Sequence, residues 1–137
     1  MPAAAFPVPT PLRIVLAEDN RLLSDVLVLL LRQSGHEVYP VSDGLAAWEE
    51  MGKDIRQYDA VITDHDMPHL TGLELVDVLR QADFRGHVVV HSASLTGEQR
   101  RHYEALGARV IVKSARAEEL LAAVREHAGN RTHSAPC

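Results

Sequence analysis

The chain alternates five times between a short run of apolar, often β-branched residues and a longer stretch in which apolar residues recur with the spacing of a helix. The predicted strands are 13–17, 37–41, 60–63, 87–91 and 109–112, and the predicted helices are 20–33, 44–55, 73–81, 97–106 and 115–127. Because the connections are short, successive strands are expected to run parallel, with right-handed crossovers that place helices on both faces of the sheet. Nearly every strand residue is apolar, as a sheet covered on both sides requires. The sequence therefore predicts an α/β fold with a doubly wound, five-stranded parallel sheet.

The two ends of the chain lack this alternation. Residues 1–11 contain four prolines and are predicted to form a disordered arm, and residues 129–137 show no apolar periodicity and are predicted to form a flexible tail. The folded domain is expected to span residues 12–128, which is long enough to bury most of its apolar side chains.

Charge and composition argue against several classes of function. The net charge is −5, from 14 basic and 19 acidic residues without a basic cluster, which disfavours a nucleic-acid surface. The single cysteine, Cys137, supplies neither a disulfide nor a thiolate metal site. The longest apolar run, 26–31, is too short to span a bilayer, and the first residues do not resemble a signal peptide. We therefore expect a soluble, cytoplasmic protein that binds neither nucleic acid nor membrane directly.

Polar side chains follow four of the five predicted strands. Glu18 and Asp19 come directly after the first strand, Asp64 after the third, Ser92 after the fourth and Lys113 after the fifth. The carboxyl ends of parallel strands meet at one edge of the sheet, where α/β proteins bind their ligands. Each residue alone has an ordinary explanation, such as capping the next helix. Their common placement predicts a shared site.

The residue types at this edge indicate a particular chemistry. Three carboxylates at one site would raise one another's pKa unless a cation joined them. Because only oxygen ligands are available, the expected cation is Mg²⁺. The hydroxyl of Ser92 and the ammonium of Lys113 can stabilise the oxygens of a transferring phosphoryl group. Asp64 is then the expected nucleophile, and an aspartyl phosphate is the product.

The pattern resembles the receiver (response regulator) domain of two-component signalling, over about residues 12–128. The matching segments are Glu18-Asp19, Asp64-x-x-Met67-Pro68-x-x-x-Gly72, Ser92-Ala93 and Lys113. The resemblance implies a flavodoxin-like (βα)5 fold with strand order 2-1-3-4-5. It also implies a phosphorelay in which a histidine kinase or a histidine phosphotransfer protein donates the phosphoryl group and an unidentified protein receives the output by direct binding.

The resemblance also implies a role for each residue of the predicted site. Asp64 would be the phosphoacceptor and a metal ligand, Asp19 a direct ligand of Mg²⁺, Glu18 the holder of a metal-bound water, and Asp66 a further ligand through its backbone carbonyl. Ser92 would contact the phosphoryl group as the family's switch hydroxyl, and Lys113 would pair with the phosphate. Such a domain catalyses its own phosphorylation and dephosphorylation but is not an enzyme that acts on other substrates.

Two positions depart from the family pattern near Lys113. The family usually follows the lysine with a proline in a cis peptide, whereas Ser114 follows here. A cis bond before a non-proline residue costs about 2.5–4 kcal/mol, so we predict a trans bond between residues 113 and 114. The family's switch aromatic, three residues before the lysine, is replaced by Val110. We therefore predict altered or weak coupling to the face formed by the fourth helix, fifth strand and fifth helix.

The first predicted helix has more apolar residues than one buried stripe needs. Its expected core face is Leu23, Val26, Leu27, Leu30 and Leu31, whereas Leu22, Val28 and Leu29 fall partly outside it. Those outer residues form either the margin of a wide core stripe or an exposed patch where, in the family, a histidine kinase or phosphotransfer helix bundle docks.

The loop after Asp64 carries two histidines and a second aspartate. His65 and His69 have i, i+4 spacing, but Pro68 prevents a helix between them, so they are expected to be exposed loop residues and not a metal-binding pair. Asp66 occupies the position from which, in the family, a side chain influences attack by water on the acyl phosphate.

Two other functions remain as alternatives. The Asp64-x-Asp66 spacing is similar to haloacid dehalogenase-type phosphohydrolases, which also form an aspartyl phosphate, but their nucleophile strand comes first and their acidic pair last. A receiver-like module that binds partners without being phosphorylated is the second alternative, left open by Val110 and Ser114. No output domain follows residue 128, which predicts a stand-alone receiver or part of a longer chain such as a hybrid kinase, and the opening methionine and proline-rich arm favour the stand-alone form.

Overall fold

Five parallel strands and five α-helices alternate along the chain in the computed structural model, which describes residues 10–134. The strands are β1 (Arg13–Ala17), β2 (Glu37–Val41), β3 (Ala60–Thr63), β4 (His87–Ser92) and β5 (Ala108–Val112), and the helices are α1 (Arg21–Gln33), α2 (Gly44–Gly52), α3 (Gly72–Gln81), α4 (Gly97–Ala105) and α5 (Ala117–Ser134). The sheet order is β2-β1-β3-β4-β5, and every neighbouring pair is parallel. The predicted fold class and strand order are therefore confirmed.

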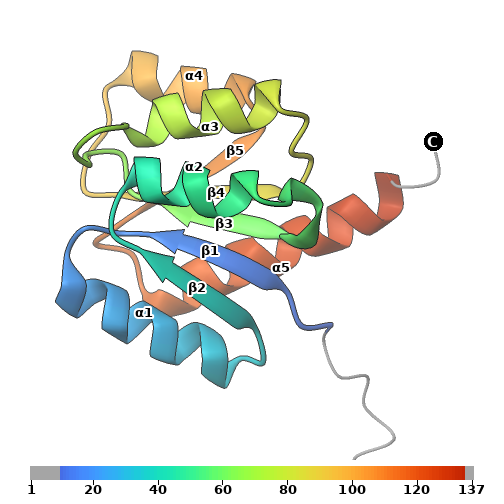
Figure 1. The fold of residues 1–137 in the computed structure, drawn as a ribbon. Coiled ribbons are helices and arrows are strands. Elements are labelled where there is room, and N and C mark those ends of the chain that lie inside the picture. The colour runs from blue at the N-terminus through green and yellow to red at the C-terminus, as the bar shows by residue number, and fades with distance from the viewer. Residues whose placement is uncertain (1–9, 135–137) are drawn as a thin grey trace, which may run out of the picture.

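The sheet is the middle of three layers. Figure 1 shows α1 and α5 on one face and α2, α3 and α4 on the other. Side chains of a strand alternate between the faces, so Ile14 and Leu16 of β1 pack toward α1 and α5, whereas Val15 packs toward α2, α3 and α4. β3 is the middle strand of the sheet, so its end lies at the centre of the sheet edge. All four of its residues are buried.

Caps at the helix ends explain the short, defined connections. The side chain of Asn20 accepts a hydrogen bond from Leu23 N and begins α1, and capping boxes at Thr71 and Thr96 begin α3 and α4. Gly35, with φ of 96°, and Gly107, with φ of 78°, follow α1 and α4 in the left-handed conformation that commonly ends a helix and that glycine adopts without strain. These connections return the chain to the same end of the sheet each time.

The structure differs from the sequence prediction at two helix ends. A 3-10 turn, η2 (Ile55–Gln57), follows α2 where the sequence predicts a continuous helix to residue 55. The helix α5 continues to Ser134, past the end predicted at residue 127 and into the predicted tail. Once a helix has formed, each added residue gains a hydrogen bond, and the next proline comes only at position 136. The disordered arm predicted for residues 1–11 and the flexible tail predicted for residues 129–137 stay predictions, and residues 1–9 and 135–137 of them lie outside the described residues.

No helix within residues 10–134 is both long enough and apolar enough to cross a bilayer.

Candidate functional site

Parallel pairing brings the predicted residues to one edge of the sheet. The backbone N–H of Asp64, directly after β3, donates to Ala17 O of β1 at 3.1 Å. The backbone N–H of Lys113, directly after β5, donates to Ser92 O of β4 at 2.8 Å. The strand ladder therefore extends one residue past these strand ends and fixes the backbone from which the functional side chains project.

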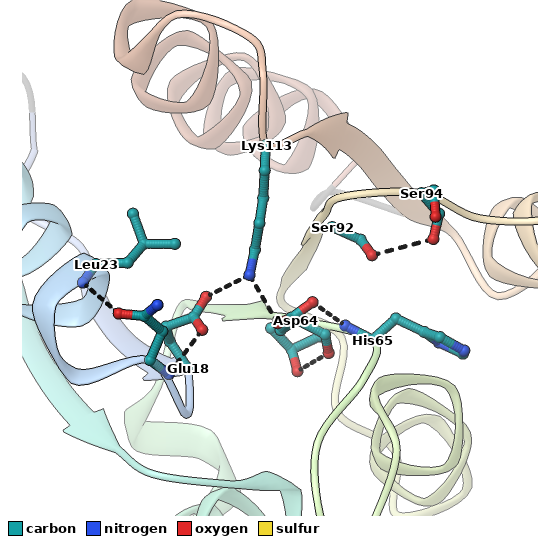
Figure 2. Close-up of polar contacts among 9 residues, drawn as sticks. Glu18, Leu23, Asp64, His65, Ser92, Ser94 and Lys113 are labelled. Carbon is teal, nitrogen blue, oxygen red and sulfur yellow. Dashed lines mark hydrogen bonds and ion pairs between the residues drawn. The ribbon is translucent and has the colours of Figure 1, made fainter.

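The carboxylate of Asp64 is buried, and both of its oxygens have partners. Oδ1 accepts a hydrogen bond from the backbone N–H of His65 at 2.7 Å, and Oδ2 accepts one from the ammonium of Lys113 at 2.8 Å. Figure 2 shows Lys113 extending toward Asp64, with Glu18 on one side of this carboxylate and Ser92 on the other. The orientation of the carboxylate is thus fixed before any ligand arrives.

Lys113 also contacts Glu18, which the structure buries beside Asp64. The ammonium lies 3.2 Å from Glu18 Oε1, and Glu18 Oε2 accepts a hydrogen bond from Asn20 N at 3.0 Å. Burial and the nearby charge of Asp64 raise the pKa of Glu18 above its ordinary value, although Asn20 and Lys113 partly oppose the rise. Partial burial lowers the pKa of Lys113, but its contacts with Asp64 and Glu18 outweigh this effect and raise it, so the lysine is charged.

Three carboxylates form a cluster with the spacing of a cation site. Glu18, Asp19 and Asp64 each offer one oxygen, and these oxygens all lie within 4.8 Å of one another. Oxygens on opposite sides of an octahedral Mg²⁺ are separated by about 4.2 Å, so small adjustments or bridging waters would allow this set to bind the ion. The ammonium of Lys113 neutralises one of the three negative charges of the cluster. The two negative charges that remain match the charge of a divalent cation. The residues present therefore fit Mg²⁺.

The remaining predicted site residues lie around this cluster. Ser92 is buried at the end of β4, and its hydroxyl donates a long hydrogen bond of 3.4 Å to Ser94 O. A bond of that length is weak, so the hydroxyl can rotate to a better acceptor. Asp66 is exposed in the loop after β3, and the ligand role predicted for its backbone carbonyl stays a prediction.

His65 is a residue of this site whose burial and contacts the sequence did not predict. It was expected to be exposed, but it is only 8% exposed, and its Nδ1 forms a hydrogen bond of 2.6 Å with the hydroxyl of Tyr103, a fully buried residue of α4. The expectation was correct for His69, whose side chain is 63% exposed. Burial raises the pKa of Tyr103 well above its ordinary value, and the charges of Asp64 and Asp66 add to the rise.

Gly72 allows the start of α3 to approach the backbone of Asp64 closely. A Cβ atom added at this position would lie 2.2 Å from the backbone oxygen of Asp64 and 2.7 Å from the hydroxyl of Tyr103. The backbone N–H of Gly72 donates to His65 O at 2.9 Å. A larger residue at position 72 would not fit between the start of α3 and the backbone of Asp64.

The departures near Lys113 also have a structural outcome. Residues 10–134 contain no cis peptide bond, which confirms the trans bond predicted between Lys113 and Ser114. Ala115 N donates to Val112 O at 3.0 Å, and this turn delays the start of α5 from the predicted residue 115 to Ala117. Val110 is half-buried against the core under α2, α3 and α4, and its effect on signalling stays a prediction.

The outer face of α1 carries an apolar stripe that we call the α1 stripe, formed by Leu22, Val26 and Leu29, which are 76%, 46% and 57% exposed. The prediction was wrong for Val26, which was placed in the core face. Val28, predicted to fall partly outside that face, is partly buried and packs against the core. Ser24 occupies the buried position because it lies in phase with Leu27 and Leu31, one turn and two turns further along the helix. Position around the helix decided burial here, not hydrophobicity.

Comparison with solved structures shows the same fold. The receiver domain of the Francisella response regulator 1452 superposes with a TM-score of 0.79 at 21% sequence identity, covering 87% of this chain and 98% of that chain. At this level of identity the similarity concerns the fold alone.

Two much longer proteins contain a segment similar to this chain. The autoinducer 2 sensor kinase/phosphatase LuxQ of Vibrio cholerae is 30% identical over 135 residues, which are 92% of this chain and 15% of LuxQ. The sensory/regulatory protein RpfC of Xanthomonas campestris is 35% identical over 105 residues, which are 74% of this chain and 14% of RpfC. This chain therefore corresponds to a small part of each relative.

A model of the response regulator receiver domain family matches residues 14–125, which include the acidic pair, Asp64, Ser92 and Lys113. The matched segment runs from β1 into α5 and so covers every strand of the sheet. The chain belongs to the response regulator receiver domain family.

Proposed function

We propose that this chain is the phosphoacceptor of a phosphorelay and that Asp64 accepts a phosphoryl group from a histidine kinase or a histidine phosphotransfer protein. The observation that supports this proposal best is the buried Asp64 carboxylate, which is bonded to Lys113 at 2.8 Å and lies beside two further carboxylates. The proposed reaction needs a nucleophile, a cation that neutralises phosphoryl oxygens and a set of metal ligands, and Asp64, Lys113 and the three carboxylates could supply them.

In the proposed reaction, one carboxylate oxygen of Asp64 forms a bond to phosphorus. The bond from phosphorus to the imidazole nitrogen of the donor histidine breaks at the same time, and that nitrogen takes up a proton. The product is an acyl phosphate on Asp64. Lys113 moves from the carboxylate to a phosphoryl oxygen, and Ser92 leaves its long contact with Ser94 to donate to another.

Glu18, Asp19 and Asp64 would hold Mg²⁺, with the backbone carbonyl of Asp66 as a further ligand. When bound, Mg²⁺ neutralises charge on the carboxylates and the phosphoryl oxygens. The contact between Lys113 and Glu18 keeps a cation at the acidic pair when the metal is absent.

The α1 stripe is the proposed docking surface for the donor. The backbone N–H of Asn20 donates a hydrogen bond to Glu18, and Leu22 lies two residues further along the chain. The α1 stripe therefore begins directly beside the acidic cluster. A donor must present its phosphohistidine to Asp64, and a helix bundle with an apolar face could cover the stripe while doing so. Relatives with receiver segments include a sensor kinase/phosphatase, which is consistent with a donor of this kind.

An interaction module that is never phosphorylated is the second candidate. The observation that favours it is that Val110 stands where the family has an aromatic residue. A module that is not switched by phosphorylation needs no aromatic ring that changes its position. It does not explain why Lys113 and three carboxylates surround Asp64.

The two candidates differ in a labelling experiment with a small radioactive phosphodonor. We expect label in the presence of Mg²⁺, no label in the presence of a chelator, and release of the label by neutral hydroxylamine, which cleaves acyl phosphates. Protein that remains unlabelled with Mg²⁺ would favour the unphosphorylated module.

A further inference from the structure

A buried contact links the residue after the phosphoacceptor to α4. The imidazole of His65 and the ring of Tyr103 have centroids 5.6 Å apart and an interplanar angle of 81°, and Nδ1 lies 2.6 Å from the hydroxyl. Figure 2 shows the His65 side chain pointing away from Glu18 and Lys113. The imidazole of His65 therefore does not contact the acidic cluster. It connects the site instead to Tyr103 of α4, which lies 38 residues further along the chain.

The backbone of His65 is held as tightly as its side chain. Its N–H donates to Asp64 Oδ1 at 2.7 Å, and its carbonyl accepts from Gly72 N at 2.9 Å. The hydroxyl of Tyr103 also reaches the start of α3, because a Cβ at Gly72 would lie 2.7 Å from it. A continuous set of contacts thus runs from the Asp64 carboxylate through His65 to Tyr103.

We propose that His65 and Tyr103 form a positioning pair that orients Asp64 and transmits its phosphorylation to α4. The proposal rests on the proposed function, because it concerns what phosphorylation of Asp64 does to its neighbours. The pair replaces, by another route, the aromatic residue that β5 lacks at Val110. We call this set of contacts the His65–Tyr103 relay.

Phosphorylation changes the atom to which the relay is bonded. Oδ1 of Asp64 shares the negative charge of a carboxylate before the reaction. If Oδ2 forms the bond to phosphorus, Oδ1 becomes the uncharged carbonyl oxygen of the acyl phosphate and the negative charge lies on the phosphoryl oxygens, so the hydrogen bond of Oδ1 with His65 N weakens or shifts. Close-packed interiors pass on such shifts instead of absorbing them. Tyr103 is fully buried, so movement of the His65 ring must displace Tyr103 and with it α4.

Electrostatics also link the two ends of the relay. The charge of Asp64 contributes to the raised pKa of Tyr103, after the larger effect of burial. The hydroxyl thus experiences the charge at the phosphoacceptor, which phosphorylation alters. Val110, in contrast, offers no polar atom in its side chain and is half-buried.

The test compares backbone amide chemical shifts with and without beryllofluoride, a phosphoryl mimic, in the presence of Mg²⁺. In the wild type we expect changes around Asp64 and along α4, residues 97–105, without large changes in β5 and the described part of α5. Tyr103→Phe keeps the ring and removes the hydroxyl, and we expect it to lose the changes in α4 while keeping those around Asp64. Tyr39→Phe is the matched control, because its hydroxyl bonds to Arg13 and Glu37 on β1 and β2.

A second variant separates the relay from a purely structural role. His65→Leu keeps the backbone donor to Asp64 and removes the imidazole, and it should lose the same changes in α4. Either variant should slow uptake from acetyl phosphate about fivefold, the scale of one orienting hydrogen bond. The double variant should lose no more than a single one, since both remove one interaction.

Several results would overturn the proposal. Changes in α4 that persist in Tyr103→Phe and in His65→Leu would show that the signal takes another route. Large changes across residues 108–125 in the wild type, in β5 and α5, would show coupling through those two elements instead. A wild type that binds the mimic without any change in α4 would refute the relay alone, whereas a wild type that neither binds the mimic nor takes up phosphate would refute the proposed function and the relay together.

Discussion

The ammonium of Lys113, directly after β5, lies 2.8 Å from Oδ2 of Asp64, directly after β3. The same ammonium lies 3.2 Å from Glu18 Oε1, so one cation serves two buried carboxylates that come from different strands. Removing one member of a buried ion pair leaves the other charge without compensation. The stability of the domain and the proposed reaction at Asp64 are therefore both expected to depend on this lysine.

Lys113→Gln should destabilise the protein, and Mg²⁺ should partly reverse the loss. The cost should be below the about 3–5 kcal/mol of breaking a fully buried pair, because the lysine side chain is 24% exposed. Urea unfolding with a chelator and with Mg²⁺ measures both effects. Lys53→Gln, which removes an exposed partner of Glu50, is the matched control. Equal stability of the two variants in the chelator would contradict this expectation.

Gly72→Ala should destabilise the domain by about 1–3 kcal/mol, the usual cost of overpacking. The added Cβ would lie 2.2 Å from Asp64 O, which is backbone and cannot easily move. Gly52→Ala in α2 is the matched control, because nothing lies within 4 Å of its added Cβ. That control should gain about 0.5–1 kcal/mol from a better helix former. Thermal or urea unfolding compares the two, and a neutral Gly72→Ala would show that α3 can move away from Asp64.

Polar substitutions in the α1 stripe should separate the two kinds of phosphodonor. Leu22→Gln with Leu29→Gln should slow transfer from a phosphorylated histidine phosphotransfer protein by about tenfold, the scale of an interface hot spot. Uptake from acetyl phosphate should not change, because a small donor needs no docking surface. Leu45→Gln, at an exposed apolar residue of α2, is the control. Equal slowing with both donors would point to damage at the acidic cluster and not to docking.

Acid should destabilise the protein below about pH 6.5 through a buried histidine. His36 accepts a hydrogen bond from Leu12 N through Nδ1 at 3.1 Å, and its buried Nε2 has no hydrogen-bond partner within residues 10–134. Burial, followed by the charge of Arg125, lowers the pKa of His36 below the ordinary 6.5. The unfolded chain takes up a proton at this position before the folded chain does, so stability is complete above pH 6.5 and falls as the pH drops below it.

The measurement is Tm as a function of pH from about pH 7.5 to about pH 5.5. His36→Asn keeps an acceptor for Leu12 N and should reduce the fall in Tm, whereas His102→Asn, at an exposed residue of α4, should not. Part of the fall should remain, because burial and the charge of Lys113 also lower the pKa of His91. An unchanged slope in His36→Asn would exclude His36 as a source.

The fold was predictable because its determinants are local in the sequence. Short apolar runs alternating with helical spacing define the strands and helices, and parallel pairing then places every strand end at one edge. Asp64 and Lys113, although 49 residues apart, could be assigned to one site by this reasoning alone. The chemical roles of these residues, in contrast, stay proposals.

What the sequence could not predict depends on how the helices pack. The contact of His65 with Tyr103 follows from the position of α4 against the loop after β3, and no spacing or composition near either residue indicates it. The end of α5 was missed for a different reason. Residues 129–137 show no apolar periodicity, so the helix was predicted to end at residue 127, but a helix that has already formed can continue without such periodicity.

The most direct test of the central claim is the intact mass of the wild type, Asp64→Asn and Asp66→Asn after incubation with acetyl phosphate and Mg²⁺. Asp66 is an exposed carboxylate two residues from Asp64, so its substitution is the matched control. We predict a gain of one phosphoryl group in the wild type and in Asp66→Asn, and no gain in Asp64→Asn. No gain in the wild type, or a gain that persists in Asp64→Asn, would contradict the assignment of Asp64 as the phosphoacceptor.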